Sequence, residues 1–146
     1  MKISTRVRYG ARLMVELGLH YGQGPFYLKQ IAKIEDISEK YLSQIIIPLK
    51  KAGLVNSFRG AKGGYVLSRP PAKITMRQIV SVLDGDLNLV KCIKNSSSCS
   101  RVSACVTRGL WDNMGNTIRN MLDSVTLKNL VEQCKDVNKT AVSYCI

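Results

Sequence analysis

Three cysteines, Cys92, Cys99 and Cys105, lie within 14 residues, separated first by six residues and then by five. Thiolates are soft ligands that suit iron–sulfur clusters, zinc and copper(I). Residues 91–108 contain no acid and four cations, Lys91, Lys94, Arg101 and Arg108. Positive neighbours lower thiol pKa values and offset the charge of an anionic cluster. The three cysteines do not have the two-residue spacing of common zinc sites. Two interpretations therefore remain: a metal or cluster site, or three reduced thiols in a flexible loop.

The cellular compartment of these thiols follows from the rest of the chain. The N-terminus has no apolar run of signal-peptide length, and no stretch approaches the ~18–20 apolar residues of a membrane span. We therefore expect a cytoplasmic protein that makes no membrane contact. In a reducing compartment the five cysteines are free, redox-active or metal-bound rather than paired in a disulfide framework.

The net charge of +12 is unevenly distributed along the chain. Residues 1–75 hold 13 basic and 4 acidic side chains, whereas residues 76–146 hold 9 and 6. A folded half with such an excess attracts a polyanion, because neutralising phosphates releases condensed counterions. The N-terminal half is thus the candidate nucleic-acid binder; a solvated basic surface is the alternative.

Apolar residues at helical spacing predict three helices in that half. The first covers about 4–21, the second about 28–35, and the third follows Ser38, a good N-cap, and ends near Gly53. Pro48 lies inside the third helix and predicts a kink or a break. Residues 54–68 change to a strand period around the glycine-rich segment 59–64, which predicts a β-hairpin.

The C-terminal half is predicted to be helical on either side of the cysteines. A helix is expected over 75–84, then a polar, serine-rich loop over 91–105. A long helix is expected from about 104 to 122, with Val106, Trp111 and Met114 on its apolar side, and a last helix over 126–134. The apolar stripe of the long helix exceeds what a small domain needs for its own core, which predicts a homodimer.

Two short helices with a tight turn, followed by a hairpin with a basic tip, form a winged helix-turn-helix, whose second helix enters the major groove of duplex DNA. The predicted DNA-binding residues are Lys40, Tyr41, Ser43, Gln44, Arg59 and Lys62. Gln44 can bond adenine bidentately, and Arg59 has the length and charge for a narrow minor groove. An ordinary three-helix core with a polar face is the alternative, and RNA is less favoured because aromatic residues make up only 6% of the chain.

Several segments resemble the Rrf2 family of bacterial transcription regulators, in its IscR-like and NsrR-like iron–sulfur branch. The similar segments are 1–10, 41–44, 49–54, 59–65, 110–111 and 126–130. The resemblance implies a mainly α fold with a small β-hairpin wing and a long C-terminal dimerisation helix. It implies a winged helix-turn-helix over 1–72, and a cysteine loop with dimerisation helices over 73–146. It also implies a homodimer bound to a palindromic DNA operator.

The resemblance extends to the three-cysteine loop, because iron–sulfur members of the family carry three cysteines there. It implies that Cys92, Cys99 and Cys105 hold an iron–sulfur cluster, of 2Fe-2S or 4Fe-4S type, which senses iron–sulfur status, iron, redox state or nitric oxide. IscR-like members place a histidine shortly after the third cysteine, where this chain has Arg108, and arginine cannot be a ligand. Candidates for the fourth ligand are Cys134, a residue of the other subunit, or a small molecule.

Other functions are weighed against this one. A cluster-free regulator of cysteine or sulfur metabolism from the same family keeps the DNA contacts and drops the cluster. A structural nucleic-acid binder would show no palindromic site and no response to iron. An enzyme is not expected, because the chain has one histidine, His20, no evident carboxylate pair and no phosphate loop.

Overall fold

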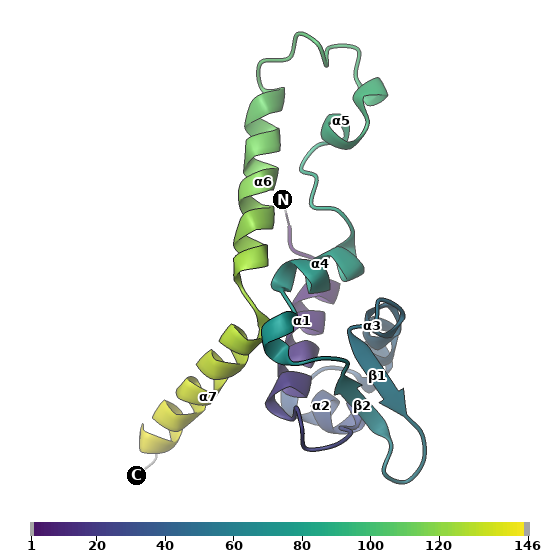
Figure 1. Ribbon diagram of the computed structural model, residues 1–146, viewed down its shortest axis with the longest axis vertical. Helices are drawn as coiled ribbons and strands as arrows, with labels where there is room; N and C mark the ends of the chain where they lie inside the picture. Colours follow the sequence, from purple (N-terminus) through teal and green to yellow (C-terminus); the bar gives the residue numbers. More distant parts are fainter. Residues whose placement is uncertain (1, 145–146) are drawn as a thin grey trace.

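The computed structural model describes residues 2–144. Seven α-helices and one two-stranded antiparallel hairpin follow one another along this part of the chain (Figure 1). The elements are α1 (Thr5–Leu19), α2 (Leu28–Glu35), α3 (Glu39–Lys51), β1 (Val55–Phe58), β2 (Gly64–Leu67), α4 (Met76–Asp84), α5 (Lys91–Lys94), α6 (Arg108–Ser124) and α7 (Leu127–Tyr144), with short 3-10 turns at Pro71–Lys73 and Ser96–Ser98. The mainly helical fold class with a hairpin wing is confirmed.

The helix-turn-helix is held by local caps and by a shared apolar core. The Ser38 side chain accepts a hydrogen bond from the Tyr41 amide and begins α3, as predicted. Between α2 and α3 the turn uses Asp36 at a left-handed φ of 51°. From the two helices Ile31 and Leu42 are both fully buried, and they pack with Leu13 of α1. Burial of these side chains fixes the angle between α2 and α3.

Helix α3 departs from the sequence prediction at Pro48. A kink or break is expected there, whereas α3 runs through Pro48 to Lys51. Proline removes one amide donor, but Leu49 is fully buried and the Ala52 amide donates to the Pro48 carbonyl at 3.0 Å. The last turn is therefore held by burial and by its own terminal bonds, and Gly53, with a φ of 73°, closes it as predicted.

The hairpin is joined to the start of α2 by a backbone bridge. Within the hairpin Val55 pairs with Leu67 and Phe58 with Gly64. Phe26 forms an isolated bridge to the hairpin, since its amide donates to the Tyr65 carbonyl at 3.0 Å and its carbonyl accepts from the Tyr65 amide at 2.9 Å. Gly64 permits this approach, because a Cβ atom there would lie 2.7 Å from the Phe26 carbonyl oxygen.

We predict that Gly64→Ala destabilises the protein by about 1–3 kcal/mol, because the φ of 123° and the Phe26 backbone both oppose a side chain. The matched control is Gly22→Ala, where φ is 83° but nothing lies within 4 Å. Urea denaturation of the two variants separates the free-energy cost of the contact with the Phe26 backbone from the cost of the positive φ alone. Equal losses in the free energy of unfolding would contradict the role of the Phe26 contact.

The C-terminal half returns to the N-terminal core. Helix α4 packs against α1 and α3, and α7 packs against α1. Ile79 of α4 and Leu127 of α7 are fully buried within the same core as Leu13. Between them, α6 extends away from the body of the protein, with α5 and the cysteine loop beside its far end (Figure 1). The cysteine loop therefore lies away from α2, α3 and the hairpin (Figure 1).

Two boundaries in this half differ from the sequence prediction. Helix α6 begins at Arg108 rather than near 104, and Val106 lies before it with 94% of its surface exposed. Val106 matches the helical period, but turn bonds such as Arg108 to Cys105 shape the backbone there. Helix α7 continues to Tyr144 instead of ending near 134, through a mostly polar segment with few apolar residues to mark a helix. None of the helices in residues 2–144 has the length and apolar character that a bilayer span requires.

Candidate nucleic-acid interface and cysteine loop

The predicted recognition residues lie on α3, and three of the four are exposed. Lys40, Ser43 and Gln44 project from the outer face of the helix. The Ser43 hydroxyl donates to the Glu39 carbonyl at 2.9 Å, so it presents its lone pairs outward. Tyr41 is half-buried against the core, with its ring edge-on to Tyr9 at 5.8 Å between centroids. Tyr41 is therefore a packing residue that is only partly accessible.

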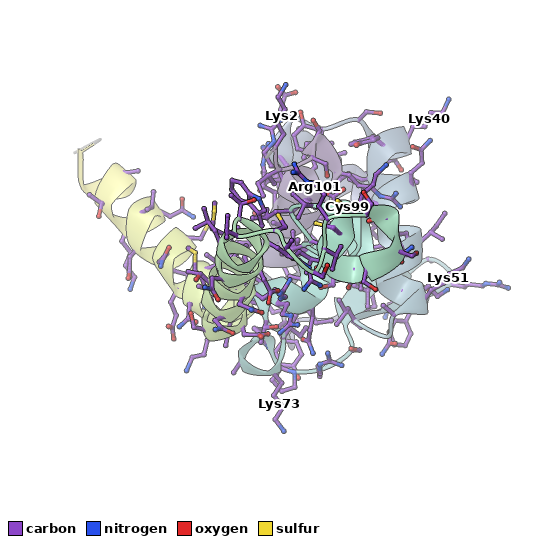
Figure 2. The ribbon with its side chains drawn as sticks, turned by 90° about the horizontal axis from the view of Figure 1, so that it is seen from above. Lys2, Lys40, Lys51, Lys73, Cys99 and Arg101 are labelled. Carbon is purple, nitrogen blue, oxygen red and sulfur yellow. The ribbon has the colours of Figure 1, made fainter. Side chains whose placement is uncertain are left out.

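The two predicted wing residues lie in the hairpin loop. Arg59 and Lys62 are both exposed, and within the described part of the chain neither takes part in a salt bridge. Figure 2 shows Lys40 and Lys51, near the two ends of α3, pointing away from the body of the protein. Helix α3 and the wing tip therefore present cations that protein carboxylates leave unneutralised.

An open groove of about 810 Å³ joins α2, α3 and the hairpin into one surface. Ser43 and Arg59 from the predicted set line it. It also contains residues that the sequence pattern missed, namely Tyr27, Lys29, Gln30, Lys50 and Phe58. The positive charge of Lys29 and Lys50 is the signal that could have identified two of them. Because side chains from all three elements meet on this open surface, we treat the groove as the candidate nucleic-acid interface.

The three loop cysteines are placed in the same region but are not gathered. Cys92 lies in α5 and is half-buried, Cys99 follows the second 3-10 turn and is exposed, and Cys105 is half-buried before α6. In residues 2–144 no three His, Cys, Asp or Glu side chains form a group that could hold a metal ion. Cys134 is half-buried on α7, and Cys145 lies outside the described residues.

Two local features of the loop favour an anionic, thiolate-bound group. The Cys105 sulfur lies 3.3 Å from the Thr107 hydroxyl, and this hydrogen bond lowers the pKa of the thiol below its ordinary value. The Arg108 Nη2 donates to the Cys92 carbonyl at 3.5 Å, while its Nε is buried and has no hydrogen-bond partner among the described residues. A buried unpaired donor costs about 1–3 kcal/mol, so an anion beside Arg108 would relieve it.

The loop therefore fits an iron–sulfur cluster in its donor chemistry and not in the spacing of its thiols. Three thiols and an unpaired guanidinium suit a soft, negatively charged group. The thiols of one chain, as folded, do not form a ligand set. Loading would require the segment between α5 and α6 to bring the three thiols together.

Comparison with known proteins identifies the family. Residues 3–133 match the Rrf2 family model, described as an iron-dependent transcriptional regulator. The chain is 42% identical to the transcriptional regulator CymR of Bacillus subtilis over 130 residues, which cover 89% of each protein. The solved structure of the same CymR, the global cysteine regulator of B. subtilis, superposes with a TM-score of 0.77 and 41% identity, over 91% of this chain and 98% of that one.

A second solved structure resembles the chain to a similar degree. The structure of T. potens IscR also gives a TM-score of 0.77, with 38% identity, over 94% of this chain and 90% of that one. These relatives are transcriptional regulators and not enzymes. The chain therefore belongs to the Rrf2 family of transcriptional regulators.

Proposed function

We propose that this chain binds double-stranded DNA at a palindromic operator as a homodimer, with α3 in the major groove and the hairpin wing along the minor groove. The observation that carries the proposal is the groove shared by α2, α3 and the hairpin, with exposed cations on its walls. A cationic concave surface beside an exposed helix complements the negatively charged phosphate backbone of a duplex.

The proposed contacts divide into base readers and phosphate binders. On α3, Gln44 bonds an adenine edge, Ser43 accepts a hydrogen bond from a neighbouring base, and Lys40 reaches a phosphate or a guanine. On the wing, Arg59 enters the minor groove and Lys62 contacts a phosphate. Half-buried Tyr41 contributes the part of its side chain that remains accessible.

Substitutions on α3 and on the wing are predicted to have different effects. Gln44→Ala costs ~1–3 kcal/mol at the preferred duplex and flattens base preference, because it removes a base contact. Lys62→Ala weakens all duplexes alike and lowers the salt slope by about 0.9, the value for one phosphate contact. Fluorescence anisotropy titrations against the preferred and a random duplex, over a salt series, measure both. Equal wild-type affinity for the two duplexes would contradict a sequence-specific regulator.

The dimer is proposed to form along α6. Leu110, Met114 and Met121 are exposed by 53%, 42% and 64% in the single chain, on a helix that extends away from the core. Such an apolar stripe on an extended helix is what a partner helix covers. In this arrangement residues 1–72 bind DNA, and residues 73–146 supply the cysteine loop and the dimer contacts.

The sensing function is proposed to reside in Cys92, Cys99 and Cys105, as ligands of an iron–sulfur cluster. The acid-free loop, the lowered pKa of Cys105 and the unpaired Arg108 donor support it. A bound cluster supplies a centre that responds to iron and redox state. The cluster changes DNA affinity only if it favours one dimer geometry over another.

A cluster-free regulator of cysteine metabolism is the second candidate. Two observations favour it: the separated thiols in the folded chain and the 42% identity to CymR. The visible absorption spectrum of protein purified without oxygen, with iron and sulfide assays, distinguishes the two. Colourless protein that binds its operator identically with and without added iron and sulfide would make the cluster-free regulator the better description.

A further inference from the structure

Tyr27 occupies the point at which α2 meets the wing. It is the residue before the first turn of α2, and its amide donates to the Gln30 side chain at 3.2 Å. Its hydroxyl crosses to the hairpin loop and donates to the backbone carbonyl of Ala61, 34 residues further along the chain. One side chain thus links the start of α2 to the tip of the wing.

The linked carbonyl lies between the two cations of the wing. Ala61 is in the loop that carries Arg59 and Lys62, and this loop also contains Gly60 and Gly63. Glycine gives a backbone more conformations to lose when it is ordered. Within the loop itself the Gly63 amide donates to the Gly60 carbonyl at 2.9 Å. The Tyr27 hydroxyl is the one side-chain hydrogen bond reaching this tip from another element in the described structure.

The backbone just before Tyr27 is anchored to neighbouring elements, so the Tyr27 hydroxyl can hold Ala61 in a fixed position. The preceding residue, Phe26, is bridged to Tyr65 by two backbone hydrogen bonds. Its ring also stacks on His20 at 3.8 Å between centroids, and His20 Nδ1 lies 2.9 Å from the Glu16 carbonyl at the end of α1. Tyr27 therefore projects from a backbone that is anchored on both sides.

We propose that Tyr27 is a positioning residue for DNA binding, which holds the wing tip at a fixed distance from α3 so that Arg59 and Gln44 engage one duplex together. This inference rests on the proposed function. Tyr27 lines the same groove as Ser43 and Arg59, and its exposed fraction of 41% leaves its ring accessible to the bound duplex. Holding the tip before binding removes an ordering cost that the DNA contacts would otherwise have to offset.

The test uses Tyr27→Phe, which keeps the ring and removes only the hydroxyl. Tyr21→Phe is the matched control, because Tyr21 is 44% exposed and its hydroxyl has no hydrogen-bond partner in residues 2–144. The probes are a duplex selected by the wild-type protein from a random pool and a random duplex of equal length. We expect Tyr27→Phe to weaken binding to the selected duplex by about 2–12-fold, the net worth of one hydrogen bond. We expect Tyr21→Phe to leave binding unchanged.

Two further measurements separate positioning from a general loss of stability. Arg59→Ala should cost less affinity in the Tyr27→Phe background than in the wild type, because a loosened wing no longer delivers Arg59 in register. Amide exchange of the free protein should be faster at Gly63 in Tyr27→Phe, while the Phe26–Tyr65 bridge keeps its protection. This second readout needs no DNA.

The outcomes are distinct. A wild-type protein that selects no duplex contradicts the proposed function, and the exchange measurement then still tests the link between Tyr27 and the wing. Selective wild-type binding with additive Tyr27 and Arg59 effects overturns the inference. So does unchanged exchange at the wing tip in Tyr27→Phe.

Discussion

Alanine at any one of Cys92, Cys99 or Cys105 is expected to abolish the visible absorption of protein purified without oxygen. In the proposed site each thiolate is one of three ligands from the loop, and loss of one ligand would open the cluster to solvent and release. The variant should then lose any difference in operator affinity between iron-loaded and iron-free protein. A coupling of ~1–3 kcal/mol, or ~5–150-fold in affinity, is the typical size of such a response. Absorption spectra, iron and sulfide content, and operator titrations of the same samples measure all three quantities.

Two cysteines outside the loop supply the controls. Cys145→Ala, at a position beyond the described residues, should keep full colour. Cys134→Ala tests whether the half-buried thiol of α7 is the missing fourth ligand, since loss of colour there would identify it. If all three loop variants retain the wild-type iron content, the cysteines are not ligands and the loop has another role.

Glutamate at Leu110 or Met121 is expected to convert the dimer to a monomer. Both side chains are more than half exposed in the single chain, so a charge there leaves the protomer core intact and opposes only a partner helix. Operator binding should fall steeply, because two linked recognition units gain ~10²–10⁴ in affinity over one. Sedimentation velocity gives the oligomeric state, and titration of a full and a half operator gives the affinity ratio.

The matched control for the dimer test is Asn120→Glu, on the same helix and exposed, but about 80–120° around the helix from the side chains of the apolar stripe. It adds the same charge and should remain a dimer. A wild-type protein that sediments as a monomer at micromolar concentration would contradict the proposed interface outright. Dimers that persist in both Leu110→Glu and Met121→Glu would place the interface on another surface.

Short-range signals were sufficient for the helix-turn-helix and for the hairpin. Ser38 caps α3 and Gly53 ends it through bonds to residues no more than five positions away, so their neighbours in the sequence contain the necessary information. The same holds for the strands on either side of the glycine-rich loop. Apolar periodicity also placed α1, α2 and α4, because each buries one face in a single core.

Periodicity failed where burial depended on another part of the molecule. Val106 matches the helical pattern of α6 but finds no neighbour to cover it and stays outside the helix. Pro48 should interrupt α3, but burial of Leu49 in the core holds the final turn in place. In both cases the prediction from local preference was wrong, because the presence or absence of a tertiary contact decided the result.

The residue types along the sequence determined which chemistry is available: an acid-free loop with three thiols, a basic N-terminal half, and glutamine, serine and lysine at helical spacing. Only the tertiary structure decided how these groups meet. It half-buried Tyr41 against Tyr9, opened one groove between α2, α3 and the wing, and joined Tyr27 to Ala61 across 34 residues. It also left the three thiols ungathered within a single chain. Contacts between distant residues depend on how whole helices pack, and the packing angle is set by the complete set of buried side chains rather than by any local motif.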